Sequence, residues 1–110
     1  MDDKERLYFD ALNEIAEHVG DSFENPISLS LLCLRLGISI GEKEKIYVSF
    51  NRILRTYNFD DLDIKYFREA LIEVVPRAAE FADKVVIALI KAYARRHIPE
   101  LYPFSETLFT

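Results

Sequence analysis

The chain has 110 residues, of which 50% are hydrophobic and 30% are charged, and its net charge is −5. This length suits one domain, in which folding hides roughly two thirds of the surface that the unfolded chain exposes, so a core forms without covalent cross-links. Cys33 is the only cysteine, which excludes a disulfide within one chain. No apolar run reaches the roughly 18 residues of a membrane span, and the N-terminus is acidic where a secretory signal is basic, so we expect a cytoplasmic protein without a membrane partner.

Charge alternates along the chain in four blocks. The net charge is −6 over residues 1–25, +3 over 26–58, −4 over 59–83 and +2 over 84–110. Neighbouring helices of opposite sign in a bundle explain this pattern, and we favour that interpretation over a basic face for an anionic partner, because the acidic blocks would repel a polyanion. The chain also lacks glutamine and is rich in Glu, Lys, Arg and Ile, a thermophile-like composition.

The first predicted element is an amphipathic helix over residues 3–19. Its apolar positions recur every three to four residues, and they are Leu7, Ala11, Leu12, Ile15 and Val19. An aspartate at position 2 or 3 is suited to cap its first turn, and Gly20 follows its last turn. Its outer face carries carboxylates, which we interpret as a solvated stripe. They are Glu5, Asp10, Glu14 and Glu17.

Two further helices are predicted on either side of Gly37. Residues 25–36 have Asn25 as a cap and Pro26 at the first helical position, and the segment is apolar nearly all round. Such a helix is either central to the core or half covered by another protein. Ser39 and Glu42 have the spacing of a capping box, which opens a third helix running to Tyr57.

The remaining chain is predicted to form two helices and an apolar arm. Asp60 and Asp61 suit the positive end of a fourth helix, which Pro76 either ends or kinks, and a fifth helix runs on to about His97. Residues 98–110 carry large apolar side chains, and exposing them together would leave a patch that monomeric proteins seldom tolerate. We therefore expect this segment to dock in the same or a neighbouring subunit. We assign partner binding to these residues, which are Leu101, Tyr102, Phe104, Leu108 and Phe109.

Few side chains have the spacing of known chemistry. His18, His97 and Cys33 are far apart in sequence, so no metal site is expected, and the aspartates at 60, 61 and 63 lack the glycine and glutamate of a calcium loop. Cys33 lies among leucines, and apolar surroundings raise the pKa of a thiol. We therefore interpret Cys33 as an unreactive residue of the core. We expect no catalytic residue and no cofactor.

One segment resembles the first helix and turn of a helix-turn-helix. Residues 30–39 place a small residue at Cys33, glycine at Gly37 and then an apolar residue followed by serine. Lys43 stands where that motif has a buried aliphatic residue, and Glu42 and Glu44 would open the recognition helix. The resemblance implies DNA binding, in which basic residues of the third and fifth helices would contact phosphates. They are Arg52, Arg55, Lys91, Arg95 and Arg96.

A second segment, residues 91–97, is similar to the arginine-to-histidine signature of small helical ribonucleases of the HEPN class. Lys91 replaces the arginine here, and Ala92 replaces the polar residue that usually follows it. The resemblance implies that His97 acts on the ribose hydroxyl or leaving group while a cation stabilises the phosphate.

Taken together, the residues predict an all-α fold with a compact bundle of about five helices over residues 1–97 and an apolar C-terminal arm over 98–110. We expect a non-enzymatic helical protein–protein interaction module that self-associates, because the second helix and the arm offer more apolar surface than a small bundle encloses. A helix-turn-helix-like DNA-binding regulator and a HEPN-like ribonuclease are the alternatives.

Overall fold

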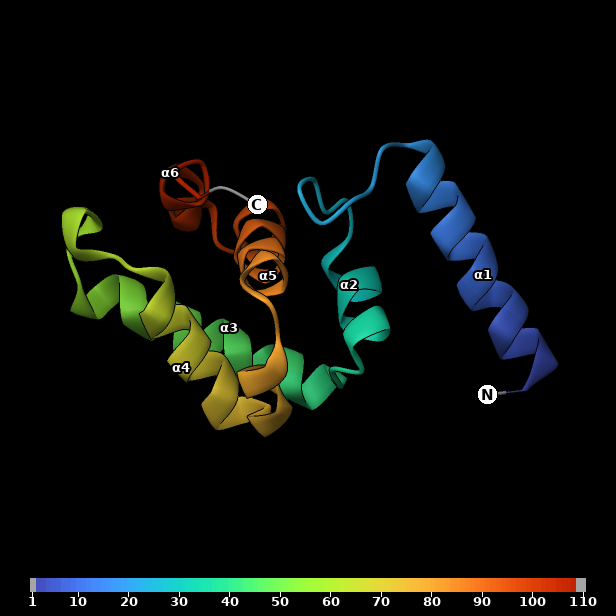
Figure 1. Cartoon of the computed structure of the whole chain (residues 1–110), viewed down its shortest axis with the longest axis horizontal. Helices are drawn as coiled ribbons and strands as arrows, with labels where there is room; N and C mark the ends of the chain where they lie inside the picture. Colours follow the sequence, from blue (N-terminus) through green and yellow to red (C-terminus); the bar gives the residue numbers. More distant parts are fainter. Residues whose placement is uncertain (1, 109–110) are drawn as a thin grey trace.

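The computed structural model describes residues 2–108, and within that part of the chain every regular element is a helix (Figure 1). The α-helices are α1 (Asp3–His18), α2 (Leu29–Leu36), α3 (Ile40–Thr56), α4 (Ile64–Val74), α5 (Asp83–Arg96) and α6 (Tyr102–Ser105). Three short 3-10 helices connect them, η1 (Phe59–Asp61), η2 (Pro76–Glu80) and η3 (Pro99–Leu101). The predicted all-α class is confirmed, and the additional sixth helix is the short α6 of the arm.

Local signals fix most helix ends. Ser39 and Glu42 form the predicted capping box, since each side chain accepts a hydrogen bond from the backbone N–H of the other residue. Gly37 ends α2 with φ of 70°, a left-handed conformation that favours glycine. Arg77 then ties this turn to η2 by donating to the carbonyl oxygen of Gly37 at 2.6 Å.

The predicted start of α2 at Asn25 and Pro26 is wrong by several residues. The N-cap is Ser28, whose hydroxyl accepts from the N–H of Leu31 at 3.1 Å. Asn25 instead closes a turn with Ser22, because its N–H donates to the Ser22 hydroxyl at 3.1 Å. Local hydrogen bonds of this loop and of Ser28 therefore override the capping signal of the asparagine–proline pair.

Pro76 ends α4 rather than kinking it. The chain continues as η2, and α5 begins only at Asp83, later than the sequence predicts. Arg68 of α4 secures this connection, since its guanidinium donates to the Phe81 carbonyl at 2.9 Å and pairs with Asp83. The aspartates at 60 and 61 lie in η1, and Asp63 caps α4 in their place.

The core is centred on α5, where most side chains from Val86 to Ala94 are buried. An aromatic series links α5 to the surrounding helices. Phe50 of α3 meets Tyr93 with ring centroids 5.2 Å apart and Phe67 of α4 at 5.1 Å, and Phe67 stacks on Phe104 at 5.3 Å. The C-terminal arm therefore completes the core of its own chain.

α1 lies apart from this core. In Figure 1 it stands at one end of the molecule, with α2 between it and the other helices. The pairs of elements that pack most closely are all formed among α2 to α6 and the 3-10 helices, and α1 belongs to none of them. The radius of gyration, 14.2 Å, exceeds the value of about 13 Å typical of a compact chain of this length. Among the described residues, no helix is long and apolar enough to cross a lipid bilayer.

Candidate functional site

The most unusual surface of the molecule is the apolar side of α1. Its large side chains are exposed, with exposed fractions of 68% for Leu7, 63% for Ile15 and 57% for Val19, and Tyr8 and Leu12 lie beside them. We call these five residues the α1 apolar face. Ala16 is the one side chain of α1 that the structure describes as buried. The prediction that α1 joins the bundle through its apolar stripe is therefore corrected: that stripe faces away from the core.

Arg35 of α2 holds α1 in this orientation. Its Nε donates to Asn13 Oδ1 at 2.6 Å, and its Nη1 meets Asp21 Oδ2 at 2.5 Å. At about 100° per residue, Asn13 lies about 160° around α1 from Ile15 and about 100° from Leu12. Because the polar side is tethered to α2, the α1 apolar face turns outward.

Arg35→Ala is expected to loosen α1 without unfolding the core. Losing these charge-assisted hydrogen bonds costs about 1 kcal/mol at a partly exposed position, so amides of the loop over residues 19–27 should exchange about fivefold faster. Hydrogen–deuterium exchange measures this effect, with Arg55→Ala on the surface of α3 as the matched control. Unchanged exchange in the loop would contradict the tether, and a large loss of global stability would contradict the separation of α1 from the core.

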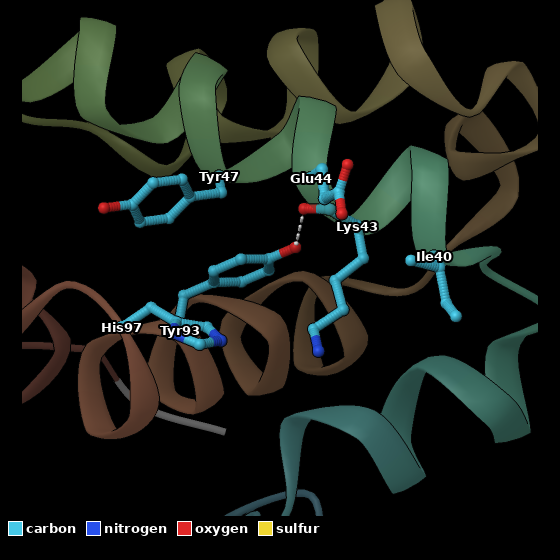
Figure 2. Close-up of a pocket in the computed structure, with 6 residues that line it drawn as sticks. All are labelled: Ile40, Lys43, Glu44, Tyr47, Tyr93 and His97. Carbon is cyan, nitrogen blue, oxygen red and sulfur yellow. Dashed lines mark hydrogen bonds between the residues drawn. The ribbon is translucent and has the colours of Figure 1, made fainter.

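A second feature is a groove of about 420 Å³ between α3 and α5, which we call the α3–α5 groove (Figure 2). Its lining residues are Ile40, Lys43, Glu44, Tyr47, Tyr93 and His97. Figure 2 shows Tyr93 in the middle of the groove, with Ile40 and Tyr47 toward its two ends. The Tyr93 hydroxyl donates to the Lys43 carbonyl at 2.6 Å and so fixes α5 against α3. Tyr47 packs edge-on against the His97 ring.

The groove has side chains of both charges beside the His97 imidazole, since Lys43 and Glu44 both line it. Partial desolvation, followed by the charges on Lys43 and Arg96, lowers the pKa of His97 below its ordinary value, so the ring is mainly neutral near pH 7. Burial raises the pKa of Tyr93, which keeps its hydroxyl protonated as a donor. The groove thus combines apolar walls with one cation and one anion in its lining, Lys43 and Glu44, and with the Arg96 charge near His97.

The structure places the predicted arm residues largely inside. Leu101 and Phe104 are buried in the core of their own chain, Leu108 is half-buried, and Tyr102 is exposed. Phe109 lies outside the described residues. A partner could reach Leu101 or Phe104 only by displacing the arm, whereas the α1 apolar face is exposed without any such rearrangement.

The cations named for nucleic-acid binding lie on more than one surface. Lys91 and Arg95 bind the loop before α2, since Arg95 donates to the Pro26 carbonyl at 3.0 Å and Lys91 to the Glu24 carbonyl at 3.4 Å. Arg52 borders α4, in a hollow that two glutamates, Glu44 and Glu73, also line. Arg55 and Arg96 are exposed on α3 and α5. The helix–turn–helix order of α2 and α3 is present, with Glu44 exposed at the start of α3.

The ribonuclease-like residues do not share one cavity. His97 lines the α3–α5 groove, whereas Lys91 lines a separate hollow beside Tyr102. Burial raises the pKa of the Cys33 thiol, an effect that Lys43 partly offsets, so little thiolate forms near neutral pH. Within residues 2–108, no group of three or more potential metal ligands comes together.

Comparison with models of known protein families, with curated proteins and with solved structures gives no match for this chain. Proposals about function therefore depend on the surfaces described above.

Proposed function

We propose that this protein is a non-enzymatic protein–protein interaction module that self-associates through the α1 apolar face. The observation that supports this function is the contiguous exposure of five large apolar side chains on one side of one helix. Soluble monomers seldom leave such a patch uncovered, and larger exposed patches mark interaction sites. An amphipathic helix that presents its apolar side is also a common recognition element.

Charge supports a second copy of the chain as the partner. Residues 2–18 carry six carboxylates and two basic side chains, a net charge of −4. Other parts of the same chain are basic, with +3 over residues 26–58. A second copy therefore offers a surface of opposite sign, and complementary potentials both steer association and disfavour wrong partners.

Sedimentation velocity over a range of concentrations tests this function. The wild-type chain should pass from monomer to dimer as concentration rises, and Leu12→Glu/Ile15→Glu should remain monomeric, because two carboxylates would be desolvated in the contact. Phe59→Glu is the matched control, since Phe59 in η1 and Leu12 have similar exposed fractions, 50% and 49%. A wild-type chain that stays monomeric, or a double variant that still dimerises, would refute the proposal.

A further inference from the structure

We propose that the α3–α5 groove of one copy receives α1 of a second copy, and that this exchange is reciprocal. The inference rests on the proposed function, because it names the surface that covers the α1 apolar face. Reciprocal exchange places each α1 in the groove of the other copy, so the two contacts are identical and the assembly closes as a two-fold dimer.

Within one chain, α1 and the groove do not meet. Arg35 tethers the polar side of α1 to α2, and α2 lies between α1 and the other helices (Figure 1). The groove is lined by residues of α3 and α5 and by His97, the residue that follows α5. Both surfaces are therefore open in the same molecule, and a second copy can supply the helix that the first copy cannot.

The dimensions of the two surfaces agree. The groove runs along α3 from Ile40 to Tyr47 (Figure 2), and seven helical residues span about 10 Å. The same spacing separates Tyr8 from Ile15 on α1, with Leu12 between them. Helices that dock in grooves use anchors at this spacing.

The groove also offers an apolar side chain at each of its two ends. Ile40 is 78% exposed, the largest exposed fraction among the large apolar side chains that the structure describes. Tyr47, at the other end, is exposed as well and presents an aromatic ring. An exposed Ile40 side chain does not stabilise a monomer, whereas a helix bound over it would remove its apolar surface from water, which is favourable.

The net charges of the helices that would meet are opposite in sign, −3 for α1 against +2 for α3 and +3 for α5. Glu5 borders the α1 apolar face, since it lies about 20° from Leu12 around the helix. The carboxylates of Asp10, Glu14 and Glu17 instead line a hollow with Arg35 on the polar side of α1. Lys43 and Arg96 lie beside His97 at the groove, close enough to lower the pKa of that residue. Glu44 also lines the groove, and the first turns of α1 carry Lys4 and Arg6 as possible partners for it.

Direct pairing of two α1 helices is the competing arrangement for a second copy. It would bring together two helices that each carry a net charge of −3. Like charges placed side by side oppose association and act against that arrangement. The groove avoids this repulsion, so the charges favour docking of α1 in the groove over pairing of α1 with α1.

A complementation experiment tests the inference. The groove variant Ile40→Glu/Lys43→Glu keeps α1 intact but loses the acceptor surface, and the α1 variant Leu12→Glu/Ile15→Glu keeps the groove but loses the donor. Each variant alone should be monomeric in sedimentation velocity, with a dimer dissociation constant raised at least about 100-fold. An equimolar mixture should form a 1:1 complex through the one remaining intact contact, more weakly than the wild-type dimer.

The matched control is Lys45→Glu/Val48→Glu, which makes the same kinds of change on α3 at residues that line a different hollow. It should dimerise like the wild-type chain, and circular dichroism should show that every variant keeps its helices. A groove variant that still dimerises, a mixture that stays monomeric, or a control that also loses the dimer would overturn groove docking while leaving the function of the α1 apolar face intact. A wild-type chain that never dimerises would refute both.

Discussion

Phe104→Ala is expected to lower the free energy of unfolding by about 3–5 kcal/mol, because it removes a buried ring from the centre of the arm. The side chain stacks on Phe67 with centroids 5.3 Å apart and is buried although it lies near the C-terminus. Domains of this kind are stable by about 5–15 kcal/mol, so one substitution removes a large share of the total. At about 4 °C per kcal/mol, the melting temperature should fall by roughly 12–20 °C.

Thermal denaturation followed by circular dichroism measures this loss. Tyr102→Ala is the matched control, since Tyr102 lies on the same short helix but is exposed, and its melting temperature should change little. Leu101→Ala, at a fully buried position of η3, should cost about 2–5 kcal/mol and provides a milder variant if Phe104→Ala fails to fold. Equal melting temperatures for Phe104→Ala and Tyr102→Ala would mean that the arm does not belong to the core.

Phe67→Ala is expected to have an effect at least as large, about 3–5 kcal/mol and toward the upper end of that range. Phe67 is fully buried and contacts rings on two sides, Phe50 of α3 at 5.1 Å and Phe104 of α6 at 5.3 Å. Its removal leaves a cavity between elements that are far apart in sequence. Chemical denaturation with urea gives the change in free energy, and Phe59→Ala at an exposed position is the control.

A double-mutant cycle separates the ring contact from simple burial. The loss in Phe67→Ala/Phe104→Ala should be smaller than the sum of the two single losses by about 0.5–1.5 kcal/mol, because the stacking of the two rings is removed only once. Strict additivity would show that the two rings do not interact, and would place the arm elsewhere on the molecule.

The interaction surface could be predicted from the sequence only in part. The sequence identified excess apolar surface but assigned it to the arm and the second helix, whereas the structure buries Leu101 and Phe104 and exposes Leu12 and Ile15. A signal for this existed in residues 1–25, where the net charge of −6 accompanies the apolar stripe. Periodicity shows that a helix has an apolar side, but not which neighbour covers that side.

The α3–α5 groove could not be predicted because its walls come from distant parts of the chain. Lys43 and Tyr93 meet through a hydrogen bond between residues 50 positions apart, and no local pattern encodes that contact. The same holds for the basic residues of the third and fifth helices. Lys91 and Arg95 donate hydrogen bonds to carbonyl oxygens of the loop before α2. Basic residues that look equivalent in the sequence therefore have different roles in the fold.

The sequence by itself determined the all-α class and several helix ends. The capping box at Ser39 and Glu42 and the left-handed turn at Gly37 each depend on backbone chemistry within a few residues. Pro76 marked an interruption, and the structure decided that α4 ends there and does not kink. The tertiary structure alone decided that the arm completes the core and that α1 stands outside it. Those outcomes depend on aromatic packing and on the Arg35 tether, which join residues separated by long stretches of chain, and hydrophobic burial is not directional enough to reveal such partners from sequence.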